Sequence, residues 1–223
     1  MKKIASPLFQ DLSEAELDTL AAAGHLRTRQ FAKHEVIFHA GSCVREIGIV
    51  LRGSVHIENL DLWGTKSILS SVGAGQAFAE TYAFCGEALM VDAVAAEHCE
   101  ILFLHTAALT DARIEPALQD KLLRRLLAVS MRKNLSLSQR IFCTTPKTVR
   151  GRLLTYFSAQ AARSGSLQFE IPFNRQQLAD YLCVERSALS GELSRAQRDS
   201  LLRFHKNHFE LCRPAQKQVP KMP

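Results

Sequence analysis

The apolar positions of this chain of 223 residues change their period twice. From about Leu26 to Leu104 they alternate with polar positions in short runs that glycine-bearing turns separate. Before this region, and again after Pro116, they recur every three or four residues, as on one face of a helix. The pattern predicts an α+β chain in which an antiparallel β-structure lies between a short helix and a helical C-terminal part.

The alternating region predicts six short strands with glycine turns between them. The strands cover Val36–Phe38, Glu46–Leu51, Ser54–Leu60, Lys66–Val72, Val91–Ala95 and Cys99–Leu104, and the turns include Gly41-Ser42, Arg52-Gly53, Trp63-Gly64 and Gly73-Ala74-Gly75. This combination is typical of a closed antiparallel sandwich or barrel. The small-residue segment 75–84 interrupts the strands and ends in a helical turn. Its backbone N–H groups can face an anionic ligand, and a plain connecting loop is the alternative.

Two helical patterns flank the strands. The first begins with the capping box Ser13-x-x-Glu16, continues through Leu17, Leu20 and Ala21, and has Pro7-Leu8-Phe9 ahead of it as a hydrophobic staple. The second runs from Pro116 to Phe142 with two apolar stripes. One stripe is Leu118, Leu122, Leu126 and Val129, and the other is Leu123, Leu127, Ser130, Asn134, Leu137 and Ile141.

The second stripe alternates spacings of four and three residues, which is the a/d seam of paired helices. Asn134 is a polar residue of the kind that fixes the register of such a pair. We therefore predict a homodimer interface made by Leu123, Leu127, Asn134, Leu137 and Ile141. The alternative is a core helix of a monomer.

A new helical unit begins after Thr144-Thr145. Pro146 suits a first helical position, and the pattern predicts a helix over 147–163 that Ser164-Gly165-Ser166 closes. The core face of this helix is expected to consist of Val149, Leu153, Leu154, Phe157 and Ala161.

The stretch 174–195 predicts a helix, a turn and a second helix. Asn174 is an N-cap before Leu178, Ala179 and Leu182, Cys183-Val184 breaks the rhythm, and a second helix starts at about Glu185. Ala188, Leu189 and Leu193 then point inward, whereas Arg186, Ser187, Ser190 and Arg195 point outward. This is helix-turn-helix spacing, in which the second helix enters the major groove of DNA. An ordinary helical hairpin is the alternative.

The segment after this stretch predicts a small hairpin and a tail. Leu202–Phe204 and His208–Leu211 flank Lys206-Asn207 as the wing of a winged helix, and the tail RPAQKQVPKMP has the composition of a disordered segment.

The net charge of +6 is unevenly distributed. Residues 1–145 hold 15 Lys and Arg against 16 Asp and Glu, whereas residues 146–223 hold 13 against 6, a net charge of +7. Such segregation favours a polyanionic partner and supports the DNA-binding interpretation. No apolar run is long enough for a membrane helix and the N-terminus lacks signal-peptide features, so we expect a cytoplasmic protein.

The remaining chemistry is sparse. The six cysteines, Cys43, Cys85, Cys99, Cys143, Cys183 and Cys212, lack metal-ligand spacing, and we expect them to be reduced and buried. A cupin-like enzyme would need clustered histidines, and His39, His98 and His105 do not supply that spacing. We therefore predict neither catalytic residues, nor a metal site, nor enzymatic activity.

Seven short sequence segments, in their order along the chain, resemble those of the Crp/Fnr family of bacterial transcription regulators. They are Pro7-Leu8-Phe9 before a capped helix, Val36-Ile37-Phe38-His39-Ala40-Gly41, Ile49-Val50-Leu51-Arg52-Gly53-Ser54-Val55, Gly75-x-x-x-x-Glu80, Cys99-Glu100-Ile101-Leu102, Lys147-Thr148-Val149-Arg150-x-x-Leu153-Leu154, and 174–182 followed by Glu185-Arg186-Ser187-Ala188-Leu189-Ser190. The resemblance implies a jelly-roll sensor domain over 1–112, a dimerisation helix over 113–143, a winged helix-turn-helix domain over 144–213 and a tail over 214–223. The alternative is a sensor or dimerisation module without a specific DNA target.

The resemblance also implies partners and a mechanism. Homodimers would bind a two-fold symmetric operator in double-stranded DNA, and RNA polymerase is a further partner that the family allows. An effector between the β-domain and the long helix would shift the arrangement of the DNA-binding domains. The effector-binding positions by resemblance are Gly75, Phe78, Ala79, Glu80, Thr81, Leu89, Met90, Lys133 and Asn134.

Departures from the family pattern exclude some candidate effectors and cofactors. Leu89 and Met90 stand where cyclic-AMP-binding members have an Arg-Ser pair, and Ala79 replaces a glycine, so we predict that cyclic AMP is not the effector. An iron-sulfur cluster would need several cysteines near the N-terminus, and Cys43 is the first one. A haem ligand at His98 or Cys99 is disfavoured, so no cofactor is predicted.

The recognition helix departs from the family pattern as well. Gly191 stands where many members have arginine, and Cys183 replaces the turn glycine. Arg186 is therefore the predicted leading contact, to a guanine edge or a phosphate, and Glu185 is favoured as a helix cap over a base contact. The predicted DNA-binding residues are Arg175, Glu185, Arg186, Ser187, Ser190 and Arg195.

Overall fold

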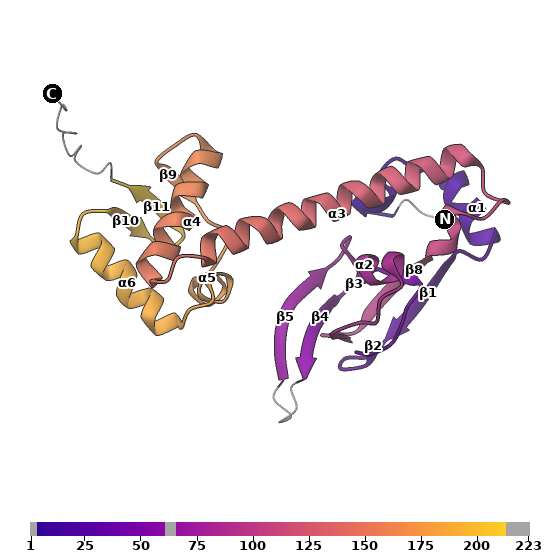
Figure 1. Cartoon of the computed structure of the whole chain (residues 1–223), viewed down its shortest axis with the longest axis horizontal. Coiled ribbons are helices and arrows are strands. Elements are labelled where there is room, and N and C mark those ends of the chain that lie inside the picture. The colour runs from indigo at the N-terminus through magenta and orange to yellow at the C-terminus, as the bar shows by residue number, and fades with distance from the viewer. Residues whose placement is uncertain (1–3, 61–65, 213–223) are drawn as a thin grey trace. The chain divides into compact units, whose positions relative to one another are not determined.

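The computed structural model describes residues 4–60 and 66–212, and the chain divides into two compact units, Met1–Lys133 and Asn134–Pro223. The helix α3 (Pro116–Thr144) begins in the first unit and ends in the second (Figure 1). The predicted tail, which follows Cys212, and the predicted turn Trp63-Gly64 lie outside the described residues.

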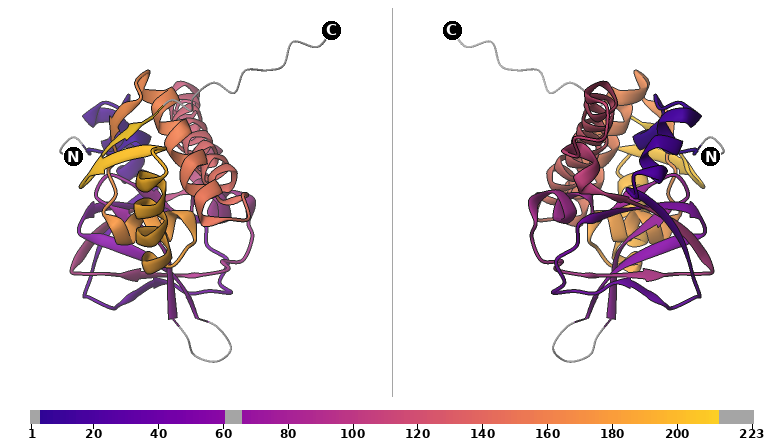
Figure 2. Two further views of the ribbon diagram at one scale, coloured as in Figure 1. Left: turned by 90° about the vertical axis from the view of Figure 1, so that its left-hand side faces the viewer. Right: turned by 90° about the vertical axis from the view of Figure 1, so that its right-hand side faces the viewer.

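The first unit contains two antiparallel four-stranded sheets (Figures 1 and 2). One has the order β1-β8-β3-β6 and the other the order β2-β7-β4-β5. The strands are β1 (Leu26–Phe31), β2 (Val36–Phe38), β3 (Glu46–Arg52), β4 (Ser54–Leu60), β5 (Lys66–Gly73), β6 (Ala77–Phe78), β7 (Asp92–Ala95) and β8 (Cys99–His105). The predicted jelly roll is confirmed, but its sheets stay separate and do not close into a continuous barrel.

All six strands predicted for the jelly roll are present within a residue of their ends, and two further strands of this unit, β1 and β6, were missed. β1 exposes four of its six residues, so its sequence lacks the alternation of a half-buried strand. β6 has only two residues, too few to show a period.

The sheet that contains β3 and β8 is covered on both faces. Ile47 and Leu102 pack into one apolar cluster with η1 (Pro7–Phe9), α1 (Glu14–Ala22) and the first half of α3. Val50 and Phe103 point to the other face and form a second cluster with the opposite sheet. This double burial explains the almost uninterrupted apolar run of β8. The predicted capping box holds the start of α1, since Ser13 N donates to Glu16 Oε2 at 2.8 Å and Glu16 N donates to Ser13 Oγ at 3.2 Å.

The space between the two sheets is filled by aromatic rings. The ring centroids of Phe38 and Phe78 lie 5.8 Å apart, and those of Phe38 and Phe103 lie 5.6 Å apart at an interplanar angle of 67°. A Cβ at Gly48 of β3 would overlap the ring of Phe78, so glycine at this position makes room for the ring. The interior of the jelly roll is therefore a packed core.

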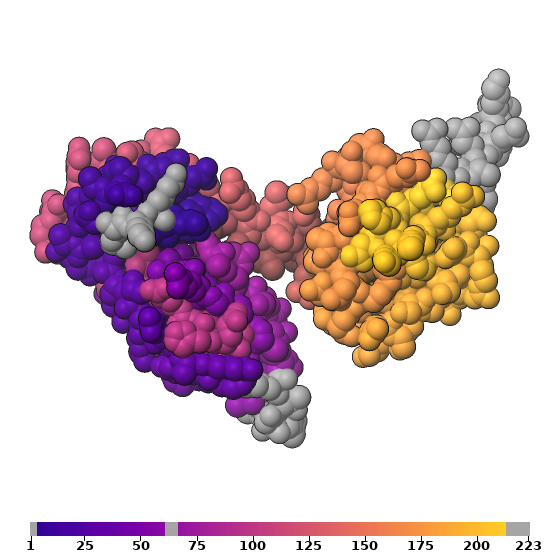
Figure 3. Space-filling model, turned by 180° about the vertical axis from the view of Figure 1, so that it is seen from behind, coloured from indigo at the N-terminus to yellow at the C-terminus, as the bar shows by residue number. Residues whose placement is uncertain are grey.

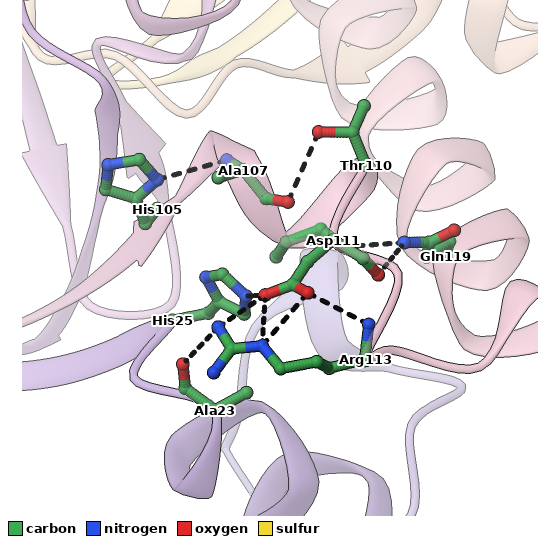
Figure 4. A network of polar contacts seen from close by, with 9 residues as sticks. Ala23, His25, His105, Ala107, Thr110, Asp111, Arg113 and Gln119 are labelled. Atoms are coloured by element: carbon green, nitrogen blue, oxygen red, sulfur yellow. Dashed lines mark hydrogen bonds and ion pairs between the residues drawn. The ribbon is translucent and has the colours of Figure 1, made fainter.

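A polar network joins the end of the jelly roll to α3 (Figure 4). Asp111 accepts hydrogen bonds from the backbone N–H of Arg113 at 2.9 Å and from its guanidinium at 2.6 to 3.1 Å. The Nε2 atom of the buried His25 lies 2.7 Å from Asp111 Oδ2, and Gln119 on α3 donates to the carbonyl of Asp111. The hydrogen bonds from Arg113, followed by that from His25, hold the pKa of Asp111 well below its ordinary value.

This network predicts a specific acid sensitivity. Because the pKa of Asp111 is lower in the folded than in the unfolded state, its contribution to stability is complete above the unfolded pKa of about 4 and is lost as the pH falls. Wild type should therefore be more stable than Asp111→Asn at pH 7, and the difference in their free energies of unfolding should shrink on acidification. Urea unfolding of both proteins between pH 7 and pH 3 measures this. A difference that does not change with pH would show that Asp111 contributes no linked stability.

The second unit is a winged helix. After α3 come α4 (Val149–Ser164), β9 (Gln168–Glu170), α5 (Arg175–Leu182), α6 (Arg186–Arg198), β10 (Leu202–His205) and β11 (His208–Leu211). The predicted hairpin is confirmed as β10 and β11, and β9 adds a third strand in the order β10-β11-β9. The strands of the hairpin lie at the surface (yellow in Figure 3).

Two expectations for this unit need correction. Pro146 does not begin α4, because the helix starts three residues later, where the side chain of Thr148 accepts a hydrogen bond from Gly151 N. The buried face of α4 consists of Leu153, Tyr156 and Phe157, whereas Val149, Leu154 and Ala161 are only partly buried. The missed Tyr156 packs its ring against Phe157, Phe173 and Tyr181.

The expectation that all six cysteines are buried is wrong for three of them, in both units of the chain. Cys99 and Cys143 are buried as expected, Cys212 is partly buried, and Cys43, Cys85 and Cys183 are exposed. Cys85 and Cys183 lie at helix ends, where local geometry places them in solvent rather than in a core.

Candidate functional site

The helix-turn-helix is built from two mutually packed helices, and a capping box holds the start of the first, α5. Asn174 Oδ1 accepts from Gln177 N, and Gln177 Oε1 accepts from Asn174 N, both at 2.9 Å. Leu178 and Leu182 of α5 share a core with Leu189 and Leu193 of α6. The predicted N-cap and the inward positions are thus confirmed, apart from Ala188, which is partly exposed.

The outer face of α6 carries most of the residues predicted to meet DNA. Arg186, Ser187 and Ser190 are exposed on it, as expected. The face continues one and two turns further with Ser194 and Arg198, which the prediction omitted although their spacing of seven and eleven residues from Ser187 places them there. Among the residues that the structure describes, neither Arg186 nor Arg198 has a hydrogen-bond or ion-pair partner.

Glu185 and Gly191 have little structural role on α6. Glu185 occupies the N-cap, but its side chain makes no capping hydrogen bond, so the predicted cap is present in position only. Apart from the adjoining backbone of α6, no atom of the described residues lies within 4 Å of the place where a Cβ would stand at Gly191, so the surface of the helix is open there.

Arg195 is held by a buried carboxylate that the sequence did not reveal. Glu192 is 6% exposed, and its Oε2 accepts from Arg195 Nη2 at 2.8 Å, while its Oε1 accepts from Arg150 Nε on α4. Arg150 Nη1 also bonds Asp199 Oδ2 at 2.7 Å. Burial alone would raise the pKa of Glu192, but the two arginines hold it below its ordinary value. The side chain of Arg195 is therefore already engaged in an ion pair with Glu192 on the same helix.

Arg175 lies against the wing. Its Nη2 donates to the carbonyl of Lys206 at 2.9 Å, and its guanidinium lies 5.0 Å from the ring centroid of Phe204 and 5.3 Å from that of Phe209. Burial lowers the pKa of Arg175. Its contacts tie the start of α5 to the wing hairpin.

In the first unit, an ion pair joins two predicted effector positions. Lys133 Nζ on α3 lies 2.7 Å from Glu80 Oε1 and 2.8 Å from the carbonyl oxygen of Ala77. Glu80 is the first residue of α2 (Glu80–Cys85) and is 5% exposed. Ala79 before it has a left-handed backbone, with φ at 62°. The chain thus brings Glu80 and Lys133 together from positions 53 residues apart.

A cavity of about 250 Å³ lies next to this pair, between α2 and α3. Its lining is mostly apolar, with Glu80, Thr81 and Ser130 as polar groups. Phe84 of α2 and Leu127 of α3 also line it. The cavity can take a small ligand or an apolar side chain.

Other predicted effector positions do not line this cavity. Phe78 and Leu89 are buried in the core between the sheets, Met90 is 76% exposed, and Asn134 is exposed in the second unit. Gly75 has φ of +81°, and a Cβ on it would collide with the carbonyl oxygen of Ala5, so its role is to let the chain turn.

The predicted dimer seam is an uncovered apolar face. Leu123, Leu127, Leu137 and Ile141 are between 47% and 65% exposed. The leucines of the first stripe, Leu118, Leu122 and Leu126, are at most 7% exposed, and its fourth member, Val129, is partly buried. Met131, Leu135 and Phe142, outside the predicted seam, are exposed as well. Exposed large apolar residues in this number mark an interaction surface.

In residues 4–60 and 66–212, no group of three or more His, Cys, Asp or Glu side chains is arranged to hold a metal ion. Within the same ranges, no helix has the length and apolar character that crossing a membrane requires.

Comparisons with known proteins match both units. The family model "Cyclic nucleotide-binding domain" matches residues 28–113, and the model "Crp-like helix-turn-helix domain" matches residues 151–216. No curated protein sequence gives a significant match.

Solved structures share the fold. The chain is similar to CprK complexed with OCPA, with 13% identity, a TM-score of 0.63 and 89% of each chain covered. It is similar to the c-di-GMP responsive global regulator CLP of Xanthomonas campestris, with 18% identity, a TM-score of 0.53 and coverage of 89% of this chain and 99% of that one. FixK2 of Bradyrhizobium japonicum has 19% identity and a TM-score of 0.50, with 83% and 92% covered.

An effector-binding jelly roll followed by a Crp-like helix-turn-helix defines a DNA-binding regulator with a sensor domain. The chain belongs to the Crp/Fnr family of transcription regulators, as its sequence blocks predict. The proteins of this family regulate transcription and are not enzymes.

Proposed function

We propose that this protein is a homodimeric transcription regulator that binds a two-fold symmetric operator, with α6 of each protomer in one major groove. The observation that carries the proposal is the exposed outer face of α6, in a segment with a net charge of +7. On this face Arg186 has no hydrogen-bond or ion-pair partner among the described residues. Arg186 would read a guanine edge or bind a phosphate, Ser187 and Ser190 would add hydrogen bonds, and Arg195 would lie at the margin.

DNA binding across a range of salt concentrations tests this proposal. The affinity for a duplex should fall steeply as salt rises, because the basic residues release counterions from phosphates. Affinity for an operator should remain above that for an unrelated duplex of equal length at every salt concentration. Equal affinity for both duplexes would contradict sequence-specific regulation.

The dimer would form along α3. Leu123, Leu127, Asn134, Leu137 and Ile141 would meet their counterparts in a second copy, which would cover apolar side chains that are otherwise in solvent. In this arrangement the sensor domain occupies residues 1–112, the dimerisation helix 113–143 and the DNA-binding domain 144–213. A cytoplasmic location and contact with RNA polymerase follow from the same proposal.

A small effector other than cyclic AMP would control operator binding. The cavity beside Glu80 and Thr81 supports an effector site at α2 and α3, and the ion pair of Lys133 gives it a polar anchor. The buried Leu89 and the exposed Met90 offer no cation or hydroxyl for a cyclic phosphate. Calorimetry with cyclic AMP should therefore show no binding at micromolar concentrations, and micromolar binding would overturn this exclusion. Native mass spectrometry of the purified protein tests for a retained effector.

A further inference from the structure

The turn between α5 and α6 contains a strained residue. Cys183 has φ of 53° and ψ of 53°, the left-handed region that a residue with a Cβ disfavours. Its amide donates to the carbonyls of Ala179 and Asp180, and Val184 N donates to the carbonyl of Ala179 at 3.0 Å. These bonds form a helix C-cap motif in which glycine is the usual residue. The turn that sets the start of α6 therefore needs support from elsewhere.

Two arginines supply that support at the C-terminus of α5. Arg152 Nη1, from α4, donates to the carbonyls of Leu182 at 3.0 Å and Cys183 at 2.8 Å. Arg140, from the last turns of α3, donates through Nη2 to the carbonyl of Asp180 at 3.0 Å and through Nε to that of Tyr181 at 3.2 Å. The last carbonyls of a helix lack partners within it and carry its negative dipole end, so two cations satisfy both requirements.

Arg140 is the more distinctive of the two. It lies 40 and 41 residues from its acceptors in sequence, and its Nη2 is also 3.6 Å from the sulfur of Cys183. Its guanidinium lies 5.9 Å from the ring centroid of Tyr181. One side chain therefore contacts three of the four residues 180–183 and joins them to α3.

We propose that Arg140 is a positioning residue for DNA recognition, which holds the C-terminus of α5 and the left-handed turn at Cys183 so that α6 leaves the turn at a fixed angle. This inference rests on the proposed function, because its main readout is operator binding. Arg140 acts on DNA through the turn and makes no contact with phosphate.

A double-mutant cycle of Arg140→Met and Cys183→Gly tests the proposal, with operator and unrelated duplexes measured across salt. Arg140→Met should lower the affinity for the operator by roughly tenfold, with a smaller effect on the unrelated duplex and no change in the salt slope. Cys183→Gly should restore part of the loss, because glycine adopts the left-handed turn without strain. Arg140→Lys, which keeps the charge but not the two-pronged geometry, should lie between Met and wild type.

Two outcomes would overturn the proposal. A salt slope reduced by about 1, with both duplexes weakened equally, would make Arg140 a phosphate contact. Strictly additive effects of the two substitutions would show that Arg140 does not act through the turn. Arg163→Met, on the exposed last turn of α4, is the control for a lost charge.

A readout that needs no DNA separates this proposal from the proposed function. Hydrogen exchange at the amides of Cys183 and Val184 should quicken in Arg140→Met and slow again in the double variant. If wild type binds no operator but the exchange pattern holds, the proposed function fails and the role of Arg140 at the turn stands. Unchanged exchange in Arg140→Met would contradict that role directly.

Discussion

Arg186→Ala is expected to lower operator affinity by roughly 5-fold to 150-fold, which corresponds to about 1 to 3 kcal/mol for the loss of a good base contact. Arg186 is the first residue of α6, is exposed, and has no partner within the described part of the chain. Arg175 and Arg195 instead bond the wing and Glu192. Arg186 is therefore the predicted DNA contact whose guanidinium is not already engaged.

The pattern of the loss identifies the role of Arg186. Affinity for a panel of operators with single base changes should show relaxed preference at one position of each half-site, measured by fluorescence anisotropy. Arg163→Ala removes one exposed charge from α4 and should keep the full preference. Uniform weakening across the panel would make Arg186 a phosphate contact, and no weakening would mean that α6 is not the recognition helix.

Leu137→Glu is expected to convert the protein to a monomer and to abolish operator binding at concentrations where wild type is saturated. Leu137 is 59% exposed on α3 and occupies a predicted seam position. In a paired helix this position lies against its counterpart, so two carboxylates would be brought together and desolvated. A monomer would hold a single half-site and would lose the second recognition helix. Analytical ultracentrifugation and operator titration measure the two effects.

Ser138→Glu is the matched control for this substitution. Ser138 is also exposed and follows Leu137 directly, so it points about 100° away around the helix. Its variant should remain a dimer and bind the operator. If Leu137→Glu remains a dimer, or if both variants are monomers, the predicted dimer interface along α3 is wrong.

Much of the fold could be predicted because its signals are local. The capping boxes at Ser13 and Asn174 consist of residues three apart, and the hairpin at Lys206-Asn207 lies between two short apolar runs. Such features can be recognised from a few consecutive residues. β1 was missed because its middle residues are all exposed, and the start of α4 was misplaced because Thr148, not Pro146, provides the cap.

The buried polar contacts of the candidate site could not be predicted, because they join residues that are far apart in the sequence. Glu192 pairs with Arg150 across 42 residues, and Arg140 reaches carbonyls about 40 residues ahead. Neither separation corresponds to a helix or strand period, so the sequence pattern does not predict these contacts. The departure at Cys183 was visible in the sequence as a missing glycine, but the two arginines that compensate for it became apparent only in three dimensions.

Selection of bound sequences from a random pool of DNA duplexes tests whether the protein is a dimer that recognises a symmetric operator. A dimer that reads DNA with α6 should enrich a two-fold symmetric motif whose half-sites lie about 10 base pairs apart, centre to centre, or a multiple of that spacing. Arg186→Ala should enrich a motif with relaxed preference at one position of each half-site. Recovery of no motif from wild type at low salt, or of an asymmetric motif bound by a single protomer, would contradict a dimeric Crp/Fnr regulator that reads DNA with α6.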